Sequence, residues 1–296
     1  MAGKRMLVLV NPNAGKGKYR QELGEVLKTF CEGGWSPTVC FTRKPGDAPG
    51  LVAEAAPDYD MVVCLGGDGT LSETAAGMML SGAPCPIGYI PLGTANDVAK
   101  TLGLSVHPLE SAQRIIAGKP LPFDLGQFGT DRYFSYIAAF GAFTEVSYAT
   151  PQEAKQALGH LAYMLEAMRR LTQLTSYHAV VEHDGGVLEG DFLFGAVTNS
   201  TSVGGLMQLD PQLVDLSDGK LEILLVHTPQ DLLDLSDIIG SIMRMDFSGP
   251  NVDFLHSAGV RFRFDRPVAW TRDGEDGGTH QEADIRVRHP GVEIMV

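Results

Sequence analysis

The first part of the chain alternates short apolar runs with segments of helical pattern. The apolar runs lack the polar alternation of a half-exposed strand, and they span residues 5–10, 38–42, 61–65 and 86–90. The intervening and following helical segments span residues 18–31, 47–56, 70–80, 96–101 and 109–117. Strands that are apolar throughout and alternate with helices are typical of a parallel sheet with helices on both faces. The pattern predicts a three-layer α/β domain.

The pattern changes near the segment GKPLPFDLGQF, after which strands predominate. These predicted strands span residues 132–140, 176–183, 187–198, 221–227 and 258–265. The segment VRFRFD places Val260, Phe262 and Phe264 on one face and charged side chains on the other, which is typical of a half-buried antiparallel strand. We predict an α/β domain over residues 1–125 and an antiparallel β-sandwich domain over residues 126–285. The sequence leaves open whether residues 286–296 return to complete the first domain.

Two further segments have apolar side chains at helical spacing, residues 152–174 and residues 230–245. The interpretation favoured by this pattern is an amphipathic helix packed on a sheet, and a lipid-facing helix is the alternative.

Composition and charge narrow the classes of function. The 296 residues carry a formal net charge of −13, which argues against nonspecific nucleic-acid binding. A local basic patch near Arg261, Arg263 and Arg266 remains a candidate contact for an anionic lipid surface. No apolar run approaches the roughly 18 to 20 residues of a membrane helix, and the N-terminal apolar run is too short for a signal peptide. We therefore expect a cytoplasmic protein.

The segment MVVCLGGDGTLSET raises a chemical question, because a core strand ends in Gly66, Gly67 and Gly69 around Asp68. Glycines let another group approach the backbone closely, and the N–H groups of the following helix point into this turn. Such a turn is a candidate phosphate site. Asp68 would repel a phosphate unless a divalent cation such as Mg²⁺ lies between them. A tight strand-to-helix turn without a ligand is the structural alternative.

Two more turns of this kind follow predicted strands, NPNAGKGK over residues 11–18 and PLGTANDVAK over residues 91–100. All three turns fall at the carboxyl edge of one predicted parallel sheet, which is where open α/β sheets bind ligands. Neither the Walker A pattern nor the G-x-G-x-x-G pattern occurs. The three turns together therefore indicate a ligand site of another type.

Two acidic loops lie in the second part of the chain. Asp215 and Asp218 precede a predicted strand, and Asp273, Glu275 and Asp276 follow another. Neither loop has the EF-hand spacing of calcium sites. Taken alone, such loops are usually solvated turns.

Taken together, these motifs resemble the catalytic-domain family of diacylglycerol kinases, in its soluble bacterial lipid-kinase branch. The matching segments are NPNAGKG, GGDGTLSE, PLGTANDVAK, DLSDGKL and RDGE, in that order, from residue 11 to residue 275. The resemblance implies an ATP-binding α/β domain and a β-sandwich domain, with the active site in the cleft between them. It implies ATP and Mg²⁺ as cofactors and transfer of the γ-phosphoryl group to a lipid hydroxyl, with diacylglycerol giving phosphatidic acid as the first expectation.

The resemblance also implies roles for individual residues. Glu275 would be the general base on the acceptor hydroxyl, and Asp68 would belong to the catalytic Mg²⁺–ATP network. A structural Mg²⁺ would bind Asp215, Asp218 and the backbone carbonyl of Lys220, linked towards Asp97. The nucleotide contacts would come from Asn11, Pro12, Asn13, Ala14, Gly15, Thr42, Gly66, Gly67, Asp68, Gly69, Thr70, Leu71, Ser72, Glu73, Thr94, Asn96 and Asp97.

The sequence leaves several alternatives open. Ser72, Val98 and Lys100 stand where many relatives have Asn, Phe and Arg, and no motif separates diacylglycerol from phosphatidylglycerol or a sphingoid base as the acceptor. An NAD kinase-like enzyme and a nucleotide-binding module without catalysis are the rival readings. The expected partner is a lipid at a membrane surface, touched transiently, with no nucleic acid, and a homodimer is a weaker expectation carried by the resemblance.

Overall fold

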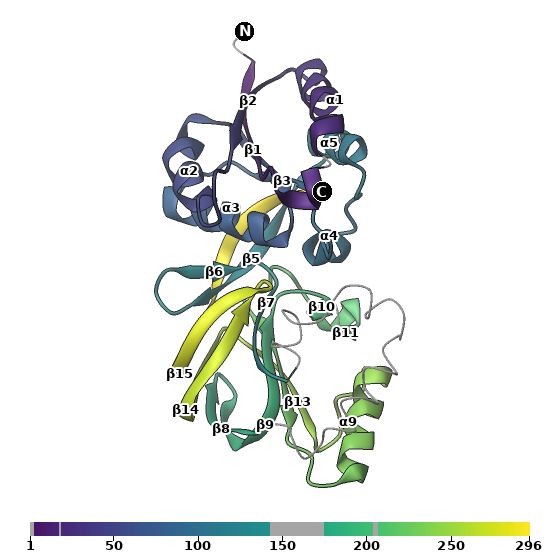
Figure 1. Ribbon diagram of the computed structural model, residues 1–296, viewed down its shortest axis with the longest axis vertical. Helices are drawn as coiled ribbons and strands as arrows, with labels where there is room; N and C mark the ends of the chain where they lie inside the picture. Colours follow the sequence, from purple (N-terminus) through teal and green to yellow (C-terminus); the bar gives the residue numbers. More distant parts are fainter. Residues whose placement is uncertain (1–2, 18, 143–174, 204–206) are drawn as a thin grey trace.

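The computed structural model describes residues 3–17, 19–142, 175–203 and 207–296. The chain forms two lobes joined by a long strand, β15, whose C-terminal end lies in the upper lobe (Figure 1). The helix expected over residues 152–174 lies outside the described residues. Within the described part of the chain, no helix is long and apolar enough to cross a membrane.

Four parallel strands form the centre of the upper lobe. They are β1 (Lys4–Val10), β2 (Trp35–Phe41), β3 (Met61–Gly66) and β4 (Ile87–Pro91). Their spatial order is β2-β1-β3-β4, and each neighbouring pair is parallel. The strands β1, β3 and β4 are almost wholly buried because helices cover both faces, which explains their continuous apolar sequences.

Alternate strand residues pack against different helices. On one face Met6 and Val8 pack with Val26 and Phe30, and on the other face Leu7 packs with residues of two further helices. The helices on the first face are α1 (Tyr19–Glu32) and α5 (Pro108–Ala117), and those on the second are α2 (Ala48–Ala55) and α3 (Asp68–Ser81). The remaining short helices of this lobe are η1 (Ala14–Gly17), η2 (Ala56–Asp58) and α4 (Asp97–Thr101).

The lower lobe consists mainly of antiparallel strands. They are β5 (Pro120–Phe128), β6 (Arg132–Phe134), β7 (Ile137–Gly141), β8 (Tyr177–His183), β9 (Gly186–Thr198), β12 (Leu221–His227), β13 (Val252–Ser257) and β14 (Gly259–Arg272). Both β7 and β8 pair with β9 and with β14, so these four strands close around an aromatic core. Phe140, Phe262 and Trp270 lie at the centre of that core.

Smaller elements complete the lower lobe. They are β10 (Ser202–Val203), β11 (Met207–Gln208), η4 (Pro211–Leu213) and α9 (Leu232–Arg244). Helix α9 begins at the cap Asp231, whose carboxylate accepts hydrogen bonds from the amides of Leu233 and Asp234.

Strand β15 (Glu275–Met295) connects the two lobes. Its first half pairs with β14, its second half pairs antiparallel with β5, and Ile294 pairs in parallel register with Ile87 of β4. All described strands of both lobes except β10 and β11, which pair only with each other, therefore belong to one continuous sheet. Residues after 286 reach the upper lobe because their apolar side chains, such as Ile294, are buried in its core.

Some sequence-based boundaries were wrong. The expected strand over residues 132–140 is two strands, β6 and β7, because the chain turns at Ser135 and Tyr136 to donate hydrogen bonds to Asp273. Helix α3 begins at Asp68 rather than residue 70. The strands β5 and β13 were not predicted. Two prolines, Pro120 and Pro122, hide the start of β5 in the sequence.

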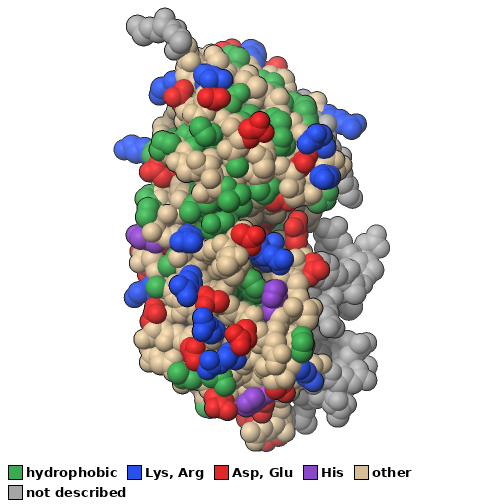
Figure 2. Space-filling view, turned by 90° about the vertical axis from the view of Figure 1, so that its left-hand side faces the viewer, with side chains coloured by type: hydrophobic (Ala, Val, Ile, Leu, Met, Phe, Trp, Pro, Cys, Tyr) green, Lys and Arg blue, Asp and Glu red, His purple; other side chains and the backbone are tan. Residues whose placement is uncertain are grey.

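The arginine-bearing face of β14 is not a free basic patch. Arg261 pairs with Asp284, and Arg263 pairs with Glu182 on β8. Arg286 also pairs with Asp284. Figure 2 shows basic and acidic side chains intermingled over the lower part of the molecule on this side. The charges of Arg261 and Arg263 are therefore compensated, whereas Arg266 donates to the carbonyl of Ser176 and lies over the ring of Tyr177.

Candidate active site

The glycines of the turn after β3 are required by close packing. A Cβ on Gly66 would lie 2.4 Å from the Cβ of Thr70, and a Cβ on Gly93 would lie 2.7 Å from the Cα of Gly67. The turn after β3 therefore packs directly against the turn after β4. The backbone of Gly67 is extended and caps α3 without a side-chain hydrogen bond, so the first N–H groups of this 14-residue helix have no side-chain cap.

The turn after β1 joins the same edge of the sheet. Asn11 donates from Nδ2 to Oγ1 of Thr70 at 2.9 Å, and its Oδ1 accepts from the amide of Asn13 at 3.0 Å. Thr42 follows β2 and donates its backbone N–H to the carbonyl of Val10. The predicted nucleotide residues of these turns are thus neighbours in space.

Three further residues predicted to contact the nucleotide differ in the groups that they present to a ligand. The Glu73 carboxylate accepts from the amide of Gly46 at 2.8 Å, and Thr94 is exposed. The side chain of Leu71 is 1% exposed and packs in the core, so only its backbone could face a ligand.

Asp68 is buried, and its carboxylate is turned towards the start of α4. Its two oxygens accept from the backbone N–H groups of Asp97 and Val98, each at 3.1 Å. Burial raises the pKa of Asp68 to about 6, although both amide hydrogen bonds oppose this shift and favour the charged form. The turn before α4 is shaped by Asn96, whose φ of 51° lies in the left-handed region that asparagine tolerates.

Glu275 begins β15 directly after the β14–β15 turn and reaches the start of α3. A Cβ on Gly69 would lie 3.1 Å from Oε1 of Glu275, so the missing side chain of Gly69 allows this approach. Partial burial raises the pKa of Glu275, and the nearby charges of Glu73 and Asp273 raise it further, against the opposing charge of Arg272. The structure therefore brings Glu275 to the same sheet edge as the three glycine-bearing turns.

Asp273 is a site residue to which the sequence assigned no role. Its carboxylate accepts from the amides of Ser135, Tyr136 and Ile137 at 2.7, 3.0 and 3.0 Å, and from Oγ of Ser135 at 3.1 Å. Its φ of 48° makes the sharp turn that presents Glu275. Burial raises the pKa of Asp273, while a hydrogen bond from Ser72 of α3 lowers it. In the sequence, the one indication that Asp273 belongs to the site was its position two residues before Glu275.

The acidic loop before β12 lies at the junction of the lobes. Asp215 accepts from the amide of Ser217 at 3.0 Å, and Asp218 accepts from the amide of Lys220 at 2.9 Å. Among the described residues, no group of three or more His, Cys, Asp or Glu side chains is arranged to hold a metal ion. The metal site expected here, the carboxylates of Asp215 and Asp218 with the backbone carbonyl of Lys220, has fewer side-chain ligands than such a group.

An excess of negative charge at this loop fits a cation. Glu222 is 1% exposed, and its Oε2 has no hydrogen-bond partner among the residues that the structure describes. Burial, followed by the charges of Asp218 and Asp215, raises the pKa of Glu222 to about 8. A Mg²⁺ ion with part of its water shell would offset the charges of Asp215 and Asp218 and favour the ionised form of Glu222, so the residues present fit the group.

Asp124, which the sequence also left without a role, ties the acidic loop to the sheet. It is fully buried and accepts from the amide of Gly219 and from Nδ1 of His289, each at 2.8 Å. Its own amide donates to the carbonyl of Leu216. Asn199 donates from Nδ2 to the Asp124 carbonyl at 2.7 Å. No local pattern marks these residues, since they come from distant segments.

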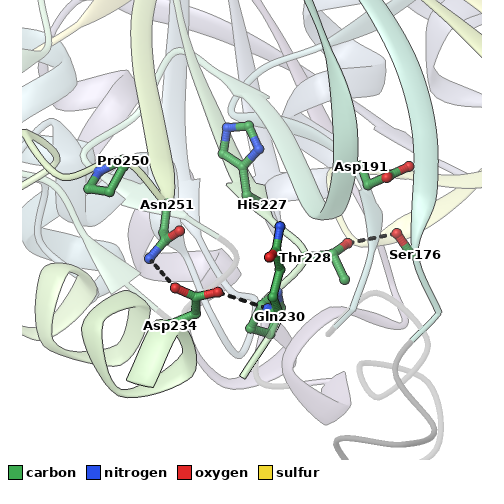
Figure 3. Close-up of a pocket in the computed structure, with 9 residues that line it drawn as sticks. Ser176, Asp191, His227, Thr228, Gln230, Asp234, Pro250 and Asn251 are labelled. Carbon is green, nitrogen blue, oxygen red and sulfur yellow. Dashed lines mark hydrogen bonds between the residues drawn. The ribbon is translucent and has the colours of Figure 1, made fainter. Parts of the chain in front are cut away.

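A polar cavity of about 360 Å³ lies elsewhere, near the start of α9 (Figure 3). Its nine lining residues include none that the sequence singled out. Several of its polar groups have partners: Asp234 accepts from the amide of Gln230 at 2.9 Å, and Ser176 and Thr228 share a hydrogen bond of 2.7 Å. The cavity is therefore separate from the candidate active site.

Comparisons with known proteins agree with this geometry. Residues 5–128 match the diacylglycerol kinase catalytic domain, and residues 139–293 match the YegS C-terminal NAD kinase beta sandwich-like domain. The chain is 31% identical over 282 residues to a diacylglycerol kinase of Bacillus subtilis (strain 168), covering 93% of this chain and 91% of the relative. It is 32% identical over 277 residues to one of Staphylococcus carnosus (strain TM300), covering 93% and 90%.

Solved structures show the same fold. One protein from Bacillus anthracis str. Sterne superposes with a TM-score of 0.82 at 24% identity, covering 100% of this chain and 96% of the other. A diacylglycerol kinase from the same organism gives a TM-score of 0.76 at 20% identity, covering 100% and 97%. The matched domains, the curated relatives and the order of motifs agree. The chain therefore belongs to the diacylglycerol kinase catalytic-domain family, a family of lipid kinases.

Proposed function

We propose that the protein transfers the γ-phosphoryl group of ATP to a lipid hydroxyl in a Mg²⁺-dependent reaction, converting diacylglycerol to phosphatidic acid. One observation carries this proposal: the Glu275 carboxylate meets the start of α3 beside Gly69, at the sheet edge where three glycine-bearing turns converge. The names of the curated relatives support diacylglycerol as the acceptor.

The start of α3 suits a nucleotide phosphate. Its amides lack a side-chain cap, and a helix N-terminus carries a partial positive charge that favours an anion. Gly66 and Gly67 keep the approach free of side chains. The neighbouring turns, with Asn11 and Thr42, would provide further contacts to the nucleotide, and Thr94 would reach it from the exposed turn after β4.

A bound Mg²⁺ would neutralise the phosphate charge that otherwise opposes both binding and transfer. Asp68 is the carboxylate of this chain that would join the Mg²⁺–ATP network, held in place by the amides of Asp97 and Val98. A second, structural Mg²⁺ would bind Asp215, Asp218 and the carbonyl of Lys220. Its charge would favour the ionised form of the nearby Glu222 carboxyl, which burial and the two aspartates disfavour.

Glu275 would accept the proton of the acceptor hydroxyl as that oxygen attacks the γ-phosphorus, while the bond from the γ-phosphorus to the bridging oxygen breaks and ADP leaves. A lipid hydroxyl is a weak nucleophile, and a positioned base typically contributes ~10²- to 10⁴-fold. Because partial desolvation and like charges raise the pKa of Glu275, its carboxylate is a better proton acceptor than a glutamate of ordinary pKa. We place the acceptor lipid in a cleft between the lobes. The protein would be cytoplasmic, as a monomer or a homodimer, and would reach the lipid during transient contact with a membrane.

The proposal is tested with γ-labelled ATP, Mg²⁺ and detergent-dispersed lipids, followed by extraction and separation of the lipids. The panel holds diacylglycerol, phosphatidylglycerol, ceramide, a sphingoid base and a monoacylglycerol. A parallel aqueous assay contains NAD, because an NAD kinase-like enzyme is the rival interpretation and the second domain matches a model described as NAD kinase beta sandwich-like. Label in diacylglycerol supports the proposal, and label in another lipid corrects the acceptor. Label in NAD alone contradicts lipid transfer.

Glu275→Gln tests the base. The variant should fold and bind ATP but lose transfer by ~10²-fold or more. Glu282→Gln is the matched control, because Glu282 lies on the same strand and is exposed like Glu275, but it lies far along the strand from the turn. A Glu275→Gln variant with near-wild-type turnover would remove Glu275 from the mechanism.

A further inference from the structure

The five-residue helix α4 determines how the Asp68 carboxylate is held. Both carboxylate oxygens bind the first amides of α4, at Asp97 and Val98. A helix this short has little stability of its own, so its position depends on tertiary contacts. Contacts that hold α4 in position therefore also hold the Asp68 carboxylate in position.

Hydroxyl groups from the lower lobe hold α4 near both of its ends. We call residues Ser200, Thr201 and Ser202, which follow β9, the hydroxyl clasp. Ser202 donates from Oγ to Oδ1 of Asp97 at 2.9 Å, at the first residue of α4. At the last residue, Oγ1 of Thr101 lies 2.9 Å from Oγ of Ser200 and 3.1 Å from Oγ1 of Thr201.

The clasp is buried and internally ordered. Asp97, Ser200 and Ser202 are 1%, 1% and 3% exposed. The amide of Ser202 donates to Oγ of Ser200 at 3.0 Å, and the amide of Leu209 donates to the carbonyl of Thr201. Water therefore cannot easily replace the Ser202 hydroxyl. If that hydroxyl is removed, the Asp97 carboxylate loses one partner and, among the described side chains, keeps Lys100 at 3.3 Å.

We propose that the hydroxyl clasp positions Asp68 for Mg²⁺–ATP, acting through Asp97 and α4 and thereby coupling the lower lobe to the nucleotide site. This inference rests on the proposed function of the site, because it assigns Asp68 to the Mg²⁺–ATP network. Ser202 is a positioning residue in this scheme, since it touches Asp97 rather than the nucleotide.

The test compares Ser202→Ala with Ser202→Thr, which keeps the hydroxyl. Ser248→Ala is the matched control, because Ser248 makes the same kind of bond, from Oγ to Oδ1 of Asp246 at 2.6 Å, beyond α9. Thr101→Val probes the other end of α4 by a change of nearly equal volume. Each full-length variant is titrated calorimetrically with ATP in Mg²⁺ and in EDTA, and its melting temperature, kcat and KM for ATP are measured.

Loss of a hydrogen bond to a charged group corresponds to a change of roughly tenfold to a hundredfold in an equilibrium constant. We expect Ser202→Ala to reduce the gain in ATP affinity that Mg²⁺ provides by about tenfold or more, and to lower kcat similarly. ATP affinity in EDTA should stay unchanged. Ser202→Thr should stay within about threefold of wild type, Thr101→Val should show a smaller loss of the same kind, and Ser248→Ala should show none.

Three outcomes would overturn the inference. Ser202→Ala could match Ser248→Ala in both Mg²⁺ dependence and kcat. Alternatively, the Ser202→Ala variant could lose ATP affinity equally in Mg²⁺ and in EDTA and show a large drop in melting temperature. That result would show that Ser202 has a merely structural role. The wild type could bind ATP without any dependence on Mg²⁺. If the wild type instead binds Mg²⁺–ATP but labels no lipid, the proposed acceptor fails while the calorimetric comparison still decides the role of the clasp.

Discussion

Asp273→Ala should both destabilise the protein and misplace its proposed base. Asp273 holds the turn between β14 and β15 by accepting hydrogen bonds from three consecutive backbone amides, those of Ser135, Tyr136 and Ile137. Removing the carboxylate leaves these donors without an acceptor. Because Glu275 is two residues further along the same turn, its approach to Gly69 depends on this anchor.

The magnitude follows from the contacts. Each buried donor left without a partner costs about 1 to 3 kcal/mol, which gives roughly 3 to 9 kcal/mol for three amides. Water that enters the vacated space would hydrogen-bond to some of these amides and reduce the loss. The wild-type carboxylate also contributes less than its hydrogen bonds suggest to the free energy of unfolding, because its burial, which raises the pKa of Asp273, is itself unfavourable. Alanine also tolerates a φ of 48° poorly. We expect a net loss of about 3 to 5 kcal/mol in the free energy of unfolding.

The assay is urea denaturation followed by tryptophan fluorescence, since Trp270 is buried close to this turn. The control is Asp276→Ala, which removes an exposed carboxylate of the same turn that accepts one hydrogen bond, from the amide of Gly278 at 2.8 Å. Its effect should stay within about 0.5 kcal/mol, as for most surface substitutions. In the lipid assay Asp273→Ala should lose most of its kcat, whereas Asp276→Ala should not.

The reasoning would be refuted if Asp273→Ala and Asp276→Ala were equally stable to within about 1 kcal/mol. In that case the four contacts to Asp273 would not support the turn. A stable Asp273→Ala variant with normal kcat would separately show that Glu275 does not depend on this anchor.

Other predictions concern the same site. Gly69→Ala should lower kcat with little effect on stability, because its Cβ would crowd Oε1 of Glu275; normal kcat would show that the carboxylate moves aside freely. The rate should rise with pH up to an inflection above the usual glutamate pKa, because Glu275 must be ionised to act as a base and its pKa is raised. Glu73→Gln should move that inflection to lower pH by removing a like charge, and a pH profile that does not move would contradict this assignment. The double variant Asp215→Ala and Asp218→Ala should lose the rise in melting temperature on adding Mg²⁺; an unchanged rise and unchanged metal content would exclude a metal at this loop.

Local sequence patterns determined the elements of the upper lobe. Each expected strand and helix there is present, because strands buried on both faces need continuous apolar runs and helices need one apolar face. The glycine-bearing turns were also visible, since close packing such as that between Gly67 and Gly93 tolerates no side chain. The motifs together were enough to indicate the family.

The sequence was less informative where an element depends on distant partners. Strands β5 and β13 have weak local signals and are stabilised by pairing with β15 and β12. The break between β6 and β7 arises because Asp273, more than a hundred residues away, binds the amides of Ser135 to Ile137.

Tertiary structure alone decided how the site is assembled. It placed Glu275 beside Gly69, turned the Asp68 carboxylate onto α4, and brought Ser202 of the lower lobe to Asp97. The type of a residue and its neighbours in the sequence determine which hydrogen bonds it can donate or accept and how much apolar surface it can bury. Which partner it meets depends on how strands of distant segments pair, and that is a property of the folded chain.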